Sequence, residues 1–251
     1  MTRFFVDPND VIDNTIRLSA EDSKHIRSLR LRPDEHFIVC DGNGNDFVCC
    51  LGKKEDSSIA EIVEQRSSLG EPSVACTVFI AFQKGERLDY AIQKSVELGT
   101  HAIVLYESKR CIAVPSNIAK KIQRLQRIAL ETAMLCGRGI VPSVSCCGYF
   151  KDMVQVAVSS SELTLLCYED EDNVHLKEVL QQHFPPLCKN EAQKLKTVSV
   201  ITGPEGGFEP DEVSLAKLSN AQVVSLGQRI LRSETAPVVA VSAIMFHTDN
   251  L

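Results

Sequence analysis

The chain has 251 residues, of which 44% are apolar and 24% charged, and its formal net charge is −6. This composition excludes a disordered chain and argues against a uniformly basic nucleic-acid binder. No run reaches the roughly 20 apolar residues of a membrane span, and the first ten residues lack the apolar core of a signal peptide. We therefore expect a cytoplasmic protein with no membrane partner.

Residues 1–70 have a mostly β pattern. A short helix is predicted over 19–30, with Ser19 as its N-cap and Asp22 three residues later. Strand-like runs follow within 36–65, and the DGNG stretch at 41–44 is typical of a tight hairpin turn. Short strands around one helix predict a small β-barrel. Ser, Gly and Pro cluster at 66–73, which indicates a linker.

From Val74 onward strands and helices alternate, which is the pattern of a parallel α/β sheet. Ser116 is expected to begin the long helix, Gly137 to end it, and Ser233 to cap the last helix. The predicted strands cover 74–82, 101–108, 163–169, 197–203 and 221–227. The predicted helices cover 87–99, 116–137, a segment ending near His183, 210–220 and 233–249.

The ten cysteines form no C-x-x-C pair and have no zinc-type spacing with histidine, so we expect free, mostly buried thiols and no metal. Scattered unpaired cysteines favour a reducing compartment. The charge is uneven along the chain. Residues 84–138 hold ten Lys/Arg against five Asp/Glu, and KHIRSLRLR at 24–32 has four Lys/Arg and no acid. Such stretches can attract an anionic partner.

Two loops carry the functional signal. ITGPEGGFEP at 201–210 leaves a predicted parallel strand at the sheet edge where α/β folds place ligands, and its glycines expose backbone amides. A tight structural turn explains it equally well when it is taken alone. The loop lacks the Lys of a P-loop, which disfavours an ATP-type enzyme. SLGQRILRSETAPVVA at 225–240 also joins a strand to a helix; by itself, its Arg229 and Glu234 suit a surface ion pair.

Together the loops closely resemble the RsmE family of SPOUT methyltransferases, which methylate N3 of a uridine in 16S ribosomal RNA using S-adenosylmethionine. GPEGGF (203–208) and LGQRILRSETA (226–236) carry the resemblance. RFFV (3–6), KHIRSLRLRPDE (24–35), DGNGNDF (41–47), QKSVELG (93–99) and SKRCIA (108–113) extend it over nearly the whole chain. One departure is Met134-Leu135 in place of the family's Glu-Gln, so any RNA contact or interface hydrogen bond of that polar pair would be lost here.

The resemblance implies an α/β fold with a SPOUT-type parallel sheet, a C-terminal deep trefoil knot and an N-terminal PUA-like β-barrel. It implies an RNA-binding domain over 1–70 and a methyltransferase domain over 74–251. Its partners would be the small ribosomal subunit and a second copy of the chain. The last helix, 234–247, would form much of that homodimer interface, although packing within its own domain remains an alternative.

The resemblance also implies site residues. The residues expected to hold the cofactor are Leu166, Thr202, Gly203, Pro204, Glu205, Gly206, Gly207, Ser225, Leu226, Gly227, Ile230, Leu231 and Arg232. Those expected to contact RNA are Arg3, Lys24, His25, Arg27, Arg30, Arg32, Lys84, Lys94, Arg110 and Arg138.

Arg232 is the first candidate to stabilise charge on O2 and O4 of the base, with an ion pair to Glu205 or Glu234 as the alternative. Either carboxylate is a candidate to accept the N3 proton. A non-catalytic RNA-binding assembly factor is the competing function.

Overall fold

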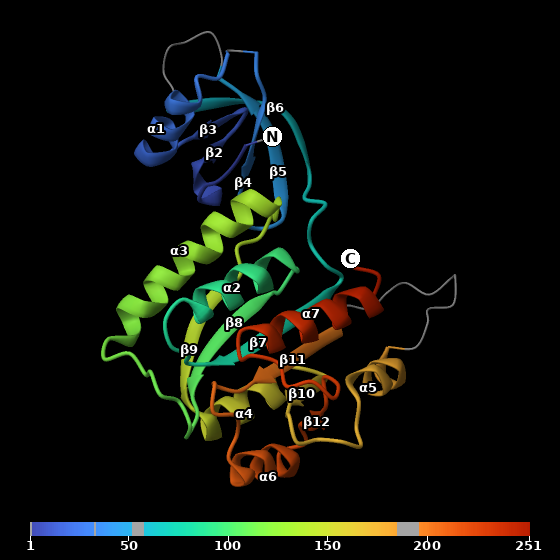
Figure 1. Ribbon diagram of the computed structural model, residues 1–251. Coiled ribbons are helices and arrows are strands. Elements are labelled where there is room, and N and C mark those ends of the chain that lie inside the picture. The colour runs from blue at the N-terminus through green and yellow to red at the C-terminus, as the bar shows by residue number, and fades with distance from the viewer. Residues whose placement is uncertain (1, 33, 52–57, 185–195) are drawn as a thin grey trace. The chain divides into compact units, whose positions relative to one another are not determined.

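The computed structural model describes residues 2–32, 34–51, 58–184 and 196–251 (Figure 1). The described chain divides into two compact units. The first comprises residues 1–71 and 130–141, and the second comprises 72–129 and 142–251. The long helix α3 therefore contributes residues to both units.

The first unit contains a six-stranded sheet and one α-helix. Its elements are β1 (Arg3–Phe5), the 3-10 turn η1 (Pro8–Asp10), β2 (Val11–Ile12), β3 (Thr15–Arg17), α1 (Ala20–Leu29), β4 (Phe37–Cys40), β5 (Asn45–Cys50) and β6 (Ile59–Ser67). The strand order is β1-β4-β5-β6-β3-β2, with only β1 and β4 parallel. The predicted hairpin joins β4 to β5. Ser19 caps α1, since its Oγ accepts from the Asp22 amide at 3.0 Å.

The core of the first unit contains Phe4, Phe37 and Phe47. Phe4 is fully buried and Phe5 is half-buried, as expected for neighbours on opposite faces of a strand. Met134 packs against this core, whereas Leu135 beside it is 89% exposed. The apolar pair that departs from the family pattern is thus split between core and surface.

The second unit is a six-stranded sheet with helices on both faces. Its elements are β7 (Val74–Ala81), α2 (Arg87–Glu97), β8 (Ala102–Glu107), α3 (Ile118–Cys136), β9 (Ser143–Tyr149), α4 (Phe150–Ser159), β10 (Leu163–Cys167), α5 (Leu176–His183), β11 (Lys196–Thr202), α6 (Pro210–Leu218), β12 (Gln222–Val224) and α7 (Thr235–His247). All strands are parallel, in the order β12-β10-β11-β7-β8-β9. The expected α/β fold with a parallel sheet is confirmed, and the trefoil knot stays a prediction.

Each face of this sheet is covered by a pair of helices that pack against each other. Helix α7 contacts α2, β7 and β11, and helix α4 contacts α6, β8 and β10. The parallel strands are consequently buried on both faces, which explains their continuous apolar sequences. The carboxyl ends of β10, β11 and β12 lie side by side, so the loops that follow them meet at one edge.

The structure corrects several local predictions. Strand β9 and helix α4 were not predicted. Asn117, and not Ser116, caps α3, because its Oδ1 accepts from the Lys120 amide at 2.9 Å. Ser233 does not cap α7, whose N-cap residue Glu234 makes no side-chain capping bond. Gly137 ends α3 at φ +84°, as expected.

No disulfide links any of the nine described cysteines, and Cys188 lies outside the described residues. Cys40, Cys49, Cys76 and Cys167 are buried, but Cys136 is exposed, contrary to expectation. Within the described ranges, no cluster of three or more His, Cys, Asp or Glu is arranged to hold a metal ion. No helix in that part of the chain is long and apolar enough to cross a membrane.

Candidate active site

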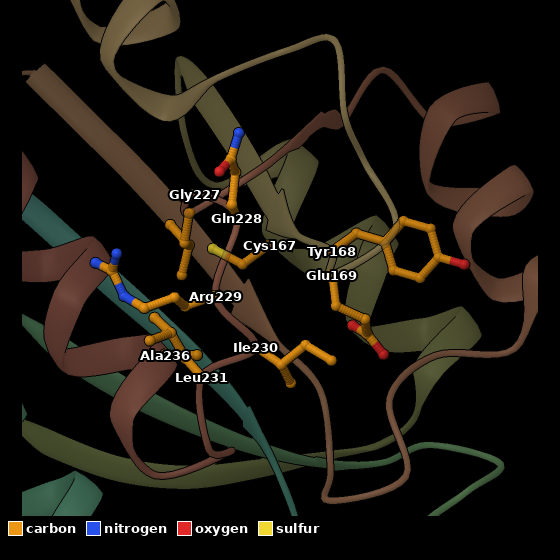
Figure 2. A pocket seen from close by; sticks show the side chains of 10 residues that line it. Cys167, Tyr168, Glu169, Gly227, Gln228, Arg229, Ile230, Leu231 and Ala236 are labelled. Carbon is orange, nitrogen blue, oxygen red and sulfur yellow. The ribbon is translucent and has the colours of Figure 1, made fainter.

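Two adjoining cavities lie at the carboxyl edge of the second sheet. The larger, of about 430 Å³, is lined by residues that follow β10 and β11 and by the segment that enters α7. The smaller, of about 70 Å³, is lined by residues after β10 and β12 (Figure 2). Five residues line both, so the cavities are neighbours, and together they are here called the cofactor cleft; the five are Cys167, Glu169, Ile230, Leu231 and Ala236.

Most residues predicted to hold the cofactor line this cleft. They are Gly203, Pro204, Glu205, Gly207, Leu226, Gly227, Ile230, Leu231 and Arg232. The structure thus brings together two motifs that are some twenty residues apart in the sequence. Four predicted residues do not line it: Leu166, Thr202, Gly206 and Ser225. Leu166 and Thr202 are buried in the sheet, and the Ser225 amide donates to the Val174 carbonyl at 2.8 Å.

The glycines of the 203–207 loop pack closely against other residues of the protein. A Cβ on Gly203 would lie 3.1 Å from the Phe208 ring, and one on Gly206 would lie 3.1 Å from Cβ of Arg110. Gly207 has φ +69°, and a Cβ there would lie 1.9 Å from Oε1 of Glu169. Gly203 and Gly207 line the larger cavity, so their bare backbone also borders the cleft.

Glu205 is the most constrained carboxylate of the cleft. Its Oε1 accepts from the Lys84 amide at 2.8 Å and from Nη1 of Arg87 at 3.1 Å. Its Oε2 is buried without a hydrogen-bond donor in the described residues. A buried acceptor without a donor is costly, so this oxygen can gain from a proton or a donor that a bound molecule brings.

Glu234 lies near two arginines without tight pairing. Its carboxylate oxygens are 3.9 Å from Nε of Arg87 and 3.9 Å from Nη1 of Arg232. The Arg232 side chain is 80% exposed, so this loose pair restrains it little. Arg232 can therefore reach a bound anionic group without breaking a buried ion pair.

Cys167 contributes a thiol to both parts of the cleft. Burial raises the pKa of Cys167 to about 12. The thiol is consequently protonated at neutral pH and is a poor nucleophile. Its place at the end of β10 fits a packing role in the wall of the cleft.

Arg3 and Arg138 are buried, which corrects the expectation that they contact RNA. Arg3 makes a two-pronged ion pair with Asp46, with N–O distances of 2.7 and 2.8 Å. Arg138 is 3% exposed and donates to Glu71 from Nη2 at 2.7 Å. Because both guanidinium groups are held by carboxylates inside the first unit, we assign them structural roles.

The other predicted RNA contacts in the first unit are exposed. They are Lys24, His25, Arg27, Arg30 and Arg32, on or directly after α1. The His25 ring also packs edge-on against Phe4, with 5.5 Å between ring centroids. In the second unit Lys84 and Arg110 are exposed and Lys94 is half-buried. Two of these cations have acidic partners: Lys94 pairs with Glu97 and Arg110 with Glu209.

Comparison with known proteins places these features in a family. The RNA methyltransferase domain model matches residues 70–245, and the RNA methyltransferase PUA domain model matches residues 18–63. A Synechocystis protein named ribosomal RNA small subunit methyltransferase E is 33% identical over 96% of this chain and 76% of its own. The chain belongs to the ribosomal RNA small subunit methyltransferase E family. The Bacillus subtilis member is 27% identical over 94% of this chain and 92% of its own.

Two solved structures extend the likeness to three dimensions. The methyltransferase E of Neisseria gonorrhoeae, bound to S-adenosylmethionine, has a TM-score of 0.81 at 28% identity and covers 98% of this chain and 97% of its own. A Legionella pneumophila methyltransferase with the same cofactor has a TM-score of 0.80 at 25% identity, with the same two coverages. The chain is thus an RNA methyltransferase with the SPOUT-type fold.

Sequence reasoning missed Arg87 and Glu169 as charged residues of this methyltransferase's cleft, and it gave Arg229, which also lines the cleft, only as a surface ion-pair residue. Arg87 comes from the start of α2, where no motif distinguishes it from other surface arginines. Glu169 is the last residue of the predicted strand 163–169, so its place at the carboxyl edge of the sheet was a usable signal.

Proposed function

We propose that this methyltransferase transfers the methyl group of S-adenosylmethionine to N3 of a uridine in the RNA of the small ribosomal subunit. The observation that carries the proposal is that both motif loops line one cleft in a chain that matches a cofactor-bound relative over 98% of its length. Backbone at Gly203, Gly207 and Gly227 and the apolar Leu226, Ile230 and Leu231 fit an adenosine, which needs flat apolar walls and amide partners.

The charged residues of the larger cavity suit the chemistry at the base. The cofactor supplies an electrophilic methyl group when it is bound. Glu205 is our candidate to accept the N3 proton, because only one of its oxygens is engaged and the other lacks a donor. Arg87 and the Lys84 amide hold the engaged oxygen, so Arg87 acts as a positioning residue. Arg232 is placed to stabilise negative charge that develops on the uracil oxygens.

The exposed cations of α1 are proposed to position the RNA. Four of them carry no side-chain ion pair in the described part of the first unit: Lys24, Arg27, Arg30 and Arg32. They suit contacts with phosphates, which position the RNA without reading its sequence. Residues 1–70 would then form the RNA-binding domain and residues 74–251 the catalytic domain. Lys84, Lys94 and Arg110 are proposed to extend the contact surface.

The function can be tested with two substrates. Purified protein and S-adenosylmethionine are incubated with isolated 16S ribosomal RNA or with small subunits, and the nucleosides are analysed by mass spectrometry. We expect 3-methyluridine to form in at least one of them. Binding of S-adenosylhomocysteine without any methylated nucleoside would instead favour the non-catalytic assembly factor.

We also propose a homodimer that uses α7. Phe246 on this helix is 77% exposed, and Val239 and Ala243 line an apolar groove of about 590 Å³ together with Leu176 and Leu180 of α5. Apolar surface of this kind on one helix marks an interaction site.

Phe246→Glu is therefore expected to convert a dimer into a monomer at micromolar concentration. A two-fold interface uses each residue twice, so the charge is introduced at two places. Sedimentation velocity measures the result. Leu218→Glu is the matched control, because Leu218 is 83% exposed on α6 and should leave the dimer intact. A monomeric wild type, or a dimeric Phe246→Glu variant, would contradict the interface.

A further inference from the structure

We infer that Glu169 binds the vicinal hydroxyls of the cofactor's ribose and thereby selects a ribonucleoside in the cleft. This inference rests on the proposed function, because it concerns the same bound molecule. Glu169 is exposed and directly follows Tyr168 after β10. No donor in the described residues hydrogen-bonds to its carboxylate, so both oxygens are available to a ligand.

The position of Glu169 within the cleft points to the ribose. The smaller cavity has Leu226, Ile230 and Leu231 among its walls, which suit the adenine. The larger cavity holds the charged side chains of Glu205, Glu234, Arg87 and Arg232. Glu169 lines both cavities and thus stands where they join. In S-adenosylmethionine the ribose connects the adenine to the sulfonium, and Glu169 is the one charged side chain among the five residues that line both cavities.

The local structure leaves room for the carboxylate in this position. Oε1 of Glu169 occupies the space that a side chain on Gly207 would fill, 1.9 Å from an ideal Cβ. Figure 2 shows the Glu169 side chain extending away from the Tyr168 ring, while Arg229 lies on the other side of the pocket. The absence of a side chain at Gly207 therefore leaves room for an acceptor beside the cleft.

The Glu169 carboxylate matches the ribose diol better than it matches the ammonium group of the cofactor. A carboxylate has two acceptor oxygens, and two neighbouring hydroxyls can each donate to one of them. In other α/β proteins an acidic residue beyond a strand end binds ribose hydroxyls in the same way. The ammonium group of the amino-acid part has Glu234 available in the larger cavity.

The test compares ligands that differ only in the sugar. S-adenosylhomocysteine and its 2′-deoxy analogue are titrated calorimetrically into wild type, Glu169→Gln and Asp172→Asn. Asp172 is an exposed carboxylate in the same loop that lines neither cavity, so its variant controls for the change in net charge. Thermal unfolding of all three proteins checks that each is folded.

We expect wild type and Asp172→Asn to prefer the ribose ligand by about 10- to 100-fold, the usual effect of a hydrogen bond to a charged group. In Glu169→Gln this preference should fall to about threefold or less. 5′-Methylthioadenosine lacks the amino acid. Glu169→Gln should weaken its binding as strongly as it weakens the binding of S-adenosylhomocysteine.

Three results would overturn the inference while the proposed function stands. The first is a ribose preference that persists in Glu169→Gln. The second is an equal loss for the ribose and deoxyribose ligands. The third is that Glu169→Gln loses affinity for S-adenosylhomocysteine but not for 5′-methylthioadenosine, which would assign Glu169 to the ammonium group. Failure of the folded wild type to bind any of these ligands would instead overturn the proposed function, and the inference with it.

Discussion

Glu205→Gln should lower the rate of methyl transfer by about 10²- to 10⁴-fold, the range for loss of a positioned general base. The amide keeps the shape of the side chain but cannot accept the N3 proton as a carboxylate does. Affinity for S-adenosylhomocysteine should change little, because this ligand carries no proton that the base removes. Single-turnover transfer of a labelled methyl group measures the rate, and calorimetry measures the affinity.

Two further variants make the assignment of Glu205 falsifiable. Glu86→Gln is the matched control, since Glu86 is exposed and lines neither part of the cofactor cleft. Its rate should equal that of wild type. Glu234→Gln tests the competing carboxylate. If Glu234→Gln loses activity while Glu205→Gln keeps it, the proton acceptor is Glu234 and the unsatisfied oxygen of Glu205 has another cause.

Asp46→Asn should destabilise the first unit by about 3–5 kcal/mol, the usual cost of removing one partner of a buried ion pair. The side chains of Arg3 and Asp46 are 7% and 4% exposed, so the arginine would keep its charge without a counter-ion. Hydrogen exchange of the amides in β1, β4 and β5 measures the loss of stability within the first unit. Asp34→Asn, at an exposed carboxylate of the same unit, should leave exchange unchanged.

The same substitution should remove a pH dependence. Burial opposes ionisation of Asp46, but hydrogen bonds from Arg3, Ser68 and Cys40 outweigh it, so the pKa of Asp46 lies below its ordinary value. The stability from Asp46 is therefore complete above the unfolded pKa of about 3.9 and is lost as the pH falls through the lower folded pKa. The difference in unfolding free energy between wild type and Asp46→Asn should be constant near neutral pH and shrink below about pH 4. A difference that is absent at neutral pH would show that the pair contributes no net stability.

The parts of the fold that sequence reasoning reached have strong local patterns. β7, β10 and β11 are continuous apolar runs because helices cover both of their faces, and the capping residues of α1 and α6 act within one turn. β9 was missed because it is an edge strand with only one fully buried side chain, Val144. Helix α4 follows it at once, without a turn residue or a side-chain cap between them.

The site was predictable where motifs define it and not where distant residues meet. The two glycine-containing loops were found because their residues are consecutive. The burial of Arg3 and Arg138 depends on carboxylates 43 and 67 residues away, and nothing in the flanking sequence indicates those partners. Arg87 reaches Glu205 across 118 residues for the same reason.

The division of the first unit between two stretches of chain has a consequence for synthesis on the ribosome. Glu71 accepts hydrogen bonds from Arg138 and from the amides of Gly139 and Ile140, so residues 130–141 complete this unit. At about 5–20 residues per second, the 70 residues from Glu71 to Val141 take on the order of 4–14 s to translate. During that delay the six strands of the N-terminal sheet lack the rest of their unit, residues 130–141, while β7, α2, β8 and most of α3 are made. The first part of the chain to emerge thus cannot finish folding until much of the second unit has been made.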